Sequence, residues 1–129
     1  MKTLFFCLCF LFFATGPTFS QEKWIAPESS KKIVNPYEGN TIATQKGERL
    51  YAKLCWTCHG KGGLGDGPAG AQLSQKPKNF ALSEIQKQSD GELFWKLSNG
   101  KGVMLPYKHS LDEEQRWQLI NYIRGFKKE

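Results

Sequence analysis

The stretch RLYAKLCWTCHG, residues 49–60, decides the fold. It contains the pattern Cys-x-x-Cys-His, in which Cys55 and Cys58 stand three residues apart and His59 follows directly. Two thiols on one helical turn can each add to a vinyl group of haem, and the next histidine then faces the iron from the same side. The spacing therefore predicts a covalently attached haem held by Cys55 and Cys58, with His59 as an iron ligand.

Other uses of these cysteines fit the sequence less well. A structural zinc site needs four ligands, and His109 is the remaining strong candidate. A thioredoxin-type redox pair follows a strand in a βαβ unit, and the sequence has no alternating strand pattern. A plain disulfide would leave His59 without a role. Cys7 and Cys9 lie in an N-terminal apolar run and are expected to leave with it.

The sequence predicts a helix before the motif and a loop after it. From Thr41 to Leu54, apolar and small residues recur at three- and four-residue spacings, which predicts a helix that runs into Cys55. Gly47 weakens this helix, so its presence indicates a close contact with another helix. Residues 60–70 contain six glycines, which predicts a loop.

Capping patterns predict two later helices. Ser89 and Glu92 form a capping box before an apolar segment that stops at Asn99-Gly100. Ser110 and Glu113 repeat the pattern before a helix rich in aromatic and aliphatic residues. With no strand pattern, the predicted class is all-α with no significant sheet. Ordered loops are predicted at residues 77–80 and 102–107.

The N-terminus predicts an export signal over residues 1–20. A lysine precedes an apolar run at residues 4–14, and small residues at 18–20 favour cleavage after Ser20. The run is shorter than the ~20 residues needed to span a bilayer, so a retained anchor is the less favoured alternative. Residues 21–40, rich in Pro, Ser, Lys and Asn, predict an extended arm that either lies on the domain or is a flexible linker. The domain itself is expected over residues 41–129.

Residues 41–126 resemble the class I c-type cytochromes. The likeness rests on the motif at 55–59, the glycine loop at 60–70, a lone Met104 ahead of Pro106-Tyr107, and an aromatic-rich terminal helix. It implies a small cytochrome c fold of about four to five helices wrapped around one haem c, with the first helix crossing the last. The arm lies outside the resemblance.

The resemblance also implies residues around the haem. The carbonyl of Pro68 would accept the free ring N–H of His59 and fix the orientation of the ring. Trp95 is a candidate donor to a haem propionate, with a plain core role as the alternative. The candidate pocket residues are Pro68, Asn79, Phe80, Trp95 and Tyr107.

Met104 is the expected sixth ligand of the iron. It is the one methionine after the predicted cleavage site, in a loop framed by Gly102 and Pro106. A thioether is a weak, neutral donor that stabilises ferrous iron and raises the reduction potential. The competitor is His109, which would give a bis-histidine site of lower potential.

Charge and export indicate the functional class. The chain carries a net charge of +6, or +5 once Lys2 leaves with the leader, which favours acidic protein partners or peripheral membrane contact. Export and the absence of a basic block argue against nucleic acid. We therefore expect an exported, periplasmic, monomeric one-electron carrier, not an enzyme. Its expected partners are larger redox proteins, such as a quinol-oxidising complex and a terminal oxidase or reductase.

Two other functions remain possible for a haem domain of this size. A peroxidase-like catalyst needs an open iron site and a positioned acid–base group. A gas or redox sensor module is normally joined to an output domain.

Overall fold

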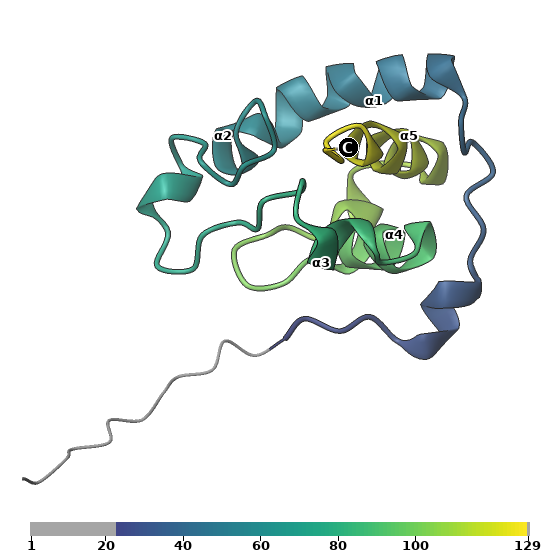
Figure 1. The fold of residues 1–129 in the computed structure, drawn as a ribbon, viewed down its shortest axis with the longest axis horizontal. Coiled ribbons are helices and arrows are strands. Elements are labelled where there is room, and N and C mark those ends of the chain that lie inside the picture. Colours follow the sequence, from purple (N-terminus) through teal and green to yellow (C-terminus); the bar gives the residue numbers. More distant parts are fainter. Residues whose placement is uncertain (1–22, 129) are drawn as a thin grey trace, which may run out of the picture.

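A computed structural model describes residues 23–128, and helices form its framework (Figure 1). The only β pairing in this part of the chain is an isolated bridge between Lys101 and Met104, so the predicted all-α class is confirmed. The predicted signal peptide lies outside the described residues. The α-helices are α1 (Thr41–Leu54), α2 (Trp56–His59), α3 (Ser83–Gln86), α4 (Asp90–Asn99) and α5 (Glu113–Arg124); the 3-10 turns are η1 (Glu28–Lys32), η2 (Gly70–Gln72) and η3 (Tyr107–His109).

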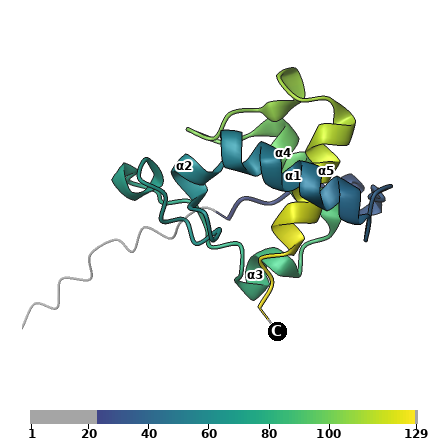
Figure 2. The same cartoon turned by 90° about the horizontal axis from the view of Figure 1, so that it is seen from above.

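Helices α1 and α5 cross in direct backbone contact (Figures 1 and 2). A Cβ atom on Gly47 would lie 1.9 Å from the carbonyl oxygen of Gln118 and 3.1 Å from the Cβ of Tyr122. No side chain fits there, which explains why a glycine interrupts an otherwise good helix. The rings of Tyr51 and Tyr122 pack nearby, with centroids 5.2 Å apart. The first helix thus crosses the last, as the resemblance implied.

The core lies where α1, α4 and α5 meet. Trp117, Leu119 and Ile120 on α5 are almost fully buried. Burial of large apolar side chains is the main force that holds such a small domain together. The cluster extends to the first cysteine of the motif, so the core and the candidate site share a wall. Its other buried members are Tyr51, Cys55, Leu93, Leu97 and Ile123.

The start of α4 agrees with the sequence. The Glu92 N–H donates to the Ser89 hydroxyl at 3.2 Å, and the Ser89 N–H donates to the Glu92 carboxylate at 2.8 Å. This capping box satisfies two backbone donors that the first helical turn leaves free. The helix ends before Gly100, whose N–H bonds to the carbonyl of Lys96.

The predicted start of α5 at Ser110 is wrong by two residues. The cap is Asp112, whose side chain accepts from the Gln115 N–H at 2.7 Å while the Gln115 side chain accepts from the Asp112 N–H at 3.0 Å. Ser110 instead closes η3, because its N–H donates to the carbonyl of Tyr107 at 3.1 Å. Aspartate caps a helix as well as serine does, so the sequence contained two possible starts.

The described part of the arm, residues 23–40, lies on the domain. Ala26, Ser30 and Asn35 are all buried, and Ser30 is only 1% exposed. A Cβ on Gly91 would lie 2.0 Å from the carbonyl oxygen of Ser30, so the arm contacts the backbone of α4 directly. The arm also contains the turn η1, which the sequence analysis did not anticipate.

Candidate haem-binding site

The Cys-x-x-Cys-His motif consists of Cys55, the N-cap of α2, and the four residues of α2, and the glycine-rich loop packs against it; we call residues 55–70 the cradle. Cys55 ends α1, where its N–H donates to the carbonyl of Tyr51 at 3.0 Å. The next turn closes with the His59 N–H donating to the Cys55 carbonyl at 2.9 Å. Both thiols are free, Cys55 buried and Cys58 half-buried. The two thiols and the imidazole therefore project from one short helical segment.

Glycines let the loop pack directly on α2. A Cβ on Gly67 would lie 2.4 Å from the carbonyl oxygen of Thr57, and one on Gly70 would lie 2.0 Å from that of Cys58. Between these points the Ala69 N–H donates to the Thr57 carbonyl at 2.8 Å. Real Cβ atoms do not come this close to a carbonyl, so the backbone of the loop takes the place of side chains. The cradle is thus fixed by main-chain contacts on both sides of the motif.

Tyr51 ties the cradle to α1. Its hydroxyl is buried and donates to the carbonyl of Gly60 at 2.7 Å. Burial raises the pKa of Tyr51, so the phenol stays protonated and keeps this donor. Gly60 has a φ of 77°, a left-handed conformation in which glycine avoids steric cost. No pattern in the sequence indicated this role of Tyr51.

His59 is prepared as a neutral ligand. Burial lowers the pKa of its imidazole to about 4, so the ring carries no proton charge at neutral pH. Phe80 stacks on it, with centroids 4.6 Å apart and an interplanar angle of 14°. The Nδ1 atom is buried and has no hydrogen-bond partner within residues 23–128, and the expected bond to the carbonyl of Pro68 is not formed. A neutral imidazole keeps a lone pair on one ring nitrogen, as a metal ligand requires.

Tyr107 lies beside the two cysteines. Its hydroxyl donates to the carbonyl of Leu54 at 3.3 Å, directly before the motif. Its pKa is raised, first by burial and then by Cys55 and Cys58. Burial likewise raises the pKa of the Cys55 thiol to about 12, so this group is held as a neutral thiol. The structure therefore brings the predicted pocket residue Tyr107 to the motif.

Met104 stands at the end of a tight turn that we call the hairpin, residues 100–104. The Lys101 N–H donates to the Met104 carbonyl at 3.1 Å, and the Met104 N–H donates back at 3.0 Å. Gly100 and Gly102 supply the positive φ angles, 63° and 59°, that this turn requires. The Met104 side chain is half-buried and packs against the core cluster that includes Cys55. His109, the competing ligand, is exposed.

The remaining predicted pocket residues differ in what they do. The Asn79 side chain accepts from the Ala81 N–H at 2.8 Å and so shapes the turn that holds Phe80. Trp95 is half-buried on α4, and no hydrogen bond of its indole occurs in the described chain. Trp117 on α5 stacks on Phe94, and its indole N–H is buried without a partner in the described residues. No sequence signal distinguished this donor from the other tryptophans.

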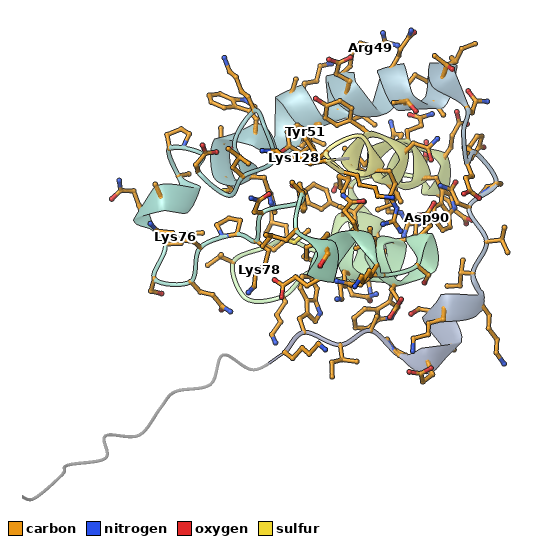
Figure 3. The ribbon with its side chains drawn as sticks, in the orientation of Figure 1. Arg49, Tyr51, Lys76, Lys78, Asp90 and Lys128 are labelled. Carbon is orange, nitrogen blue, oxygen red and sulfur yellow. The ribbon has the colours of Figure 1, made fainter. Side chains whose placement is uncertain are left out.

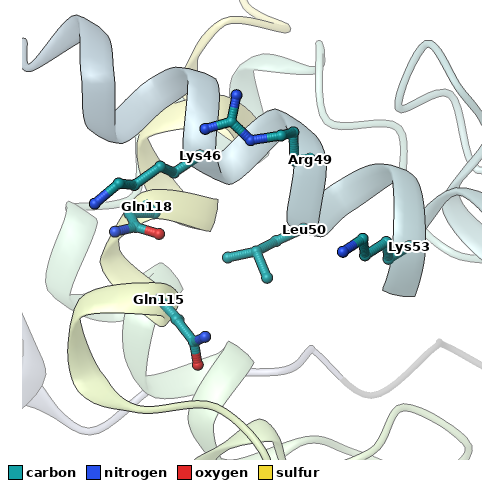
Figure 4. Close-up of a pocket in the computed structure, with 6 residues that line it drawn as sticks. All are labelled: Lys46, Arg49, Leu50, Lys53, Gln115 and Gln118. Atoms are coloured by element: carbon teal, nitrogen blue, oxygen red, sulfur yellow. The ribbon is translucent and has the colours of Figure 1, made fainter.

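A cationic pocket lies elsewhere, between α1 and α5 (Figure 4). It has a volume of about 220 Å³, and no residue of the cradle lines it. Figure 3 shows Arg49 on the outer side of α1. Lys46 pairs loosely with Glu114 across its rim at 3.4 Å. The pocket is lined by Lys46, Arg49, Leu50, Lys53, Gln115 and Gln118.

The residues gathered at the cradle fit a covalently bound haem. They supply two free thiols and a neutral imidazole, and the half-buried Met104 thioether packs on the core cluster that includes Cys55. Over residues 23–128, no three or more His, Cys, Asp or Glu side chains converge as a metal site would require. Within the same residues, no helix is long and apolar enough to cross a bilayer.

Comparisons with known proteins agree with this geometry. The family model described as cytochrome c oxidase, cbb3-type, subunit III matches residues 42–123. No curated protein matches the sequence. A solved c-type cytochrome, KustC0563, is 35% identical, with a TM-score of 0.55 over 64% of this chain and 98% of its own.

Two further solved structures share the fold. Cytochrome cL from Hyphomicrobium denitrificans is 24% identical, with a TM-score of 0.56 over 80% of this chain and 64% of its own. A chain of the reducing HAO-like protein complex of Kuenenia stuttgartiensis is 24% identical, with a TM-score of 0.66 over 74% of this chain. This chain spans 50% of the length of that protein. Since the family model covers well over half of the sequence and includes the whole cradle, the chain belongs to the cytochrome c family described as cytochrome c oxidase, cbb3-type, subunit III, and binds haem c covalently through Cys-x-x-Cys-His.

Proposed function

We propose that this protein is a one-electron carrier in which His59 and Met104 are the axial ligands of the iron. Cys55 and Cys58 hold the porphyrin, and the bound haem supplies the one-electron chemistry by alternating between ferrous and ferric iron. Two protein ligands close the iron to small molecules, which favours electron transfer over catalysis. The cradle keeps the imidazole neutral and fixed while the hairpin presents the thioether.

One observation carries the ligand assignment. Of the two candidates for the sixth position, Met104 packs on the cluster that contains Cys55, whereas His109 is exposed. A thioether donor also stabilises ferrous iron, which raises the potential as a carrier to a terminal acceptor requires.

The near-infrared spectrum tests this assignment. Ferric protein should show a weak band at about 700 nm, as expected of an iron–methionine bond. Met104→Ala should abolish the band, lower the reduction potential and allow the ferrous protein to bind carbon monoxide. His109→Ala is the matched control, five residues away, and should change none of these. Survival of the band without Met104, or its loss in His109→Ala alone, would show that the sixth ligand is a different residue.

We further propose that partners dock on the hairpin. Val103 and the following Leu105 are exposed to 72% and 68%, and the net charge of the chain is +6. An apolar patch on a basic protein suits an acidic redox partner, such as a quinol-oxidising complex or a terminal oxidase or reductase. Electron transfer to such a partner should slow as salt rises. A rate independent of salt would point to a purely apolar interface.

Export completes the proposal. A leader over residues 1–20 would deliver the chain to the compartment where the two thioether bonds form, as a soluble monomer in the periplasm or an equivalent space. The N-terminus of the purified protein should then be at or near Gln21, as read by Edman degradation or mass spectrometry. Intact protein that begins at Met1 and stays with membranes would show instead that the segment is kept as an anchor.

A further inference from the structure

The arm runs along the outer side of α4 in the opposite direction to the helix (Figure 1). Near its start, the ring of Trp24 lies under the Lys96 ammonium group, 5.6 Å from ring centroid to nitrogen. Near its middle, the Ser30 carbonyl contacts the backbone of Gly91 at the other end of the helix. The arm therefore touches α4 at both ends. An extended linker would not bury its own small residues in this way.

A buried amide fastens the end of the arm. The Asn35 side-chain amide donates to the Asp90 carboxylate and to the Asn121 side chain, both at 2.7 Å. Its oxygen accepts from the Tyr37 N–H at 2.9 Å. Asn35 and Asn121 are 6% and 8% exposed, so these two side chains have little access to water as a substitute partner. Loss of the amide would leave buried polar groups unsatisfied, which costs more than an exposed hydrogen bond.

The same carboxylate joins α4 to α5. The second oxygen of Asp90 accepts from Arg124 Nε at 2.6 Å, and Asp90 lies between these helices in Figure 3. Arg124 also donates to the carbonyl of Gln86, the last residue of α3, at 3.0 Å. We call Asn35, Asp90, Asn121 and Arg124 the polar lock. It connects the arm, the first turn of α4 and the last turns of α5.

Helix α4 in turn carries the hairpin. The Gly100 N–H donates to the Lys96 carbonyl at 2.9 Å, so the hairpin begins on the last turn of the helix. A Cβ on Gly100 would lie 2.3 Å from the Met104 carbonyl oxygen, which shows how closely the two segments approach. On its inner side, α4 buries Leu93 and Leu97 in the core. Any displacement of α4 would therefore move the backbone of Met104.

We propose that residues 24–37 form a strap that positions the axial methionine: the polar lock and the Trp24 contact hold α4, and α4 holds the Met104 hairpin. This inference rests on the proposed role of Met104 as iron ligand. A thioether is a weak ligand, so a small loss of positioning increases the fraction of time during which the iron is open. Asn35 and Trp24 are thus positioning residues that act at a distance from the haem.

Carbon monoxide binding to the intact ferrous haem protein measures this opening. Asn35→Ala should bind carbon monoxide about tenfold faster than the wild type, because one buried hydrogen-bonding group is worth about one factor of ten in an opening equilibrium. Trp24→Ala should show a smaller increase. Val34→Ala is the matched control, since Val34 is next to Asn35 and 79% exposed, and it should bind at the wild-type rate.

A second control separates positioning from general stability. Ala43→Gly changes a buried position in the first turn of α1, outside the polar lock, and should lower the melting temperature without changing the carbon monoxide rate. If Asn35→Ala melts lower but binds at the wild-type rate, the arm is only a stabilising segment and the proposal is wrong. If the wild type lacks the band near ~700 nm, the methionine assignment itself fails.

Hydrogen exchange on the unaltered haem protein gives an independent test if Asn35→Ala does not fold. The amides of Gly100 and Met104 should become exposed in the same opening event as the arm amide of Ile33, which bonds to the Ser30 carbonyl at 3.1 Å. Separate openings, with the hairpin exchanging while the arm stays protected, would overturn the strap.

Discussion

The cradle and the hairpin are held in place in opposite ways. In the cradle, an added Cβ on Gly67 or Gly70 would collide with a carbonyl of α2. In the hairpin, a Cβ on Gly102 would meet nothing within 4 Å, and the neighbouring Val103 is 72% exposed. The cradle is closed by backbone packed on backbone. The hairpin is held by a pair of hydrogen bonds and by the helix from which it extends.

This difference shows which of the two segments is held by close backbone packing. The motif residues Cys55, Cys58 and His59 lie beside a loop whose glycines pack against the backbone of α2. The proposed sixth ligand, Met104, lies in a turn whose tip is open and whose start is held by α4. If Met104 binds the iron as proposed, covalent attachment should not depend on the hairpin, whereas iron–sulfur ligation should depend on both regions.

The largest effect should come from the two thiols. A Cys55→Ala, Cys58→Ala double variant should lose all covalent haem and unfold largely, because the domain then lacks the cofactor that completes its core. Denaturing gels stained for haem, with circular dichroism of the soluble fraction, measure both outcomes. Met104→Ala is the matched variant on the hairpin side and should keep its full covalent haem. Haem that acid acetone extracts completely from the wild type would contradict covalent attachment.

Glycine substitution compares the two regions directly. Gly70→Ala forces a Cβ to within 2.0 Å of the Cys58 carbonyl and should destabilise the protein by about 3 kcal/mol, since backbone must move. Gly102→Ala has space but a φ of 59°, so its cost should be about 1 kcal/mol. Denaturant unfolding of the haem proteins gives both free energies of unfolding. Equal losses of unfolding free energy would mean that the cradle accommodates an added methyl group as easily as the hairpin does.

Tyr51 tests the link between the cradle and α1. Tyr51→Phe removes the bond to the Gly60 carbonyl and should cost about 1 kcal/mol at neutral pH. Because the pKa of Tyr51 is raised in the folded state, the unfolded phenol ionises first, and the contribution of Tyr51 is lost as pH rises above about 10. The difference in stability between wild type and variant should therefore shrink in that range. A constant difference from pH 8 to 11 would contradict this protonated donor.

The smallest effect should come from the tip of the hairpin. Val103→Ala removes an exposed side chain and should change the free energy of unfolding by less than about 0.5 kcal/mol. If the patch beside Met104 is the docking surface, the same variant should still slow electron transfer to an acidic partner protein in stopped-flow measurements. Ile42→Ala, at another exposed apolar position that is 66% accessible, is the matched control and should leave the rate unchanged.

Much of this structure could be predicted from local sequence patterns. The Ser89–Glu92 capping box and the stop at Gly100 are local, because each depends on residues one helical turn apart. Gly47 indicated a close contact with another helix, because glycine in a helix interior lowers the stability of the helix. The Cys-x-x-Cys-His spacing identified the site for the same reason: its geometry is contained within one turn.

Other features depend on contacts between distant segments and leave no local trace. The arm has no periodic pattern of apolar residues. Its attachment depends on hydrogen bonds from Asn35 to Asp90 and Asn121, which follow far later in the chain. The error at Ser110 arose because Asp112 offered an equally good cap. The expected bond from His59 to the Pro68 carbonyl came from family likeness and is not formed, since Nδ1 of His59 is buried without a partner in the described residues.

The contact between Gly47 and the Gln118 backbone has a consequence for how the protein is made. The helices that touch there are the first and the last of the domain, so a growing chain has no partner for α1 until α5 has been synthesised. Contacts between such distant segments form slowly, since a long loop must close before they contribute. The contact between α1 and α5 can therefore form only after α5 has been synthesised. Haem ligation and closure of the chain can then occur as late events on a completed polypeptide.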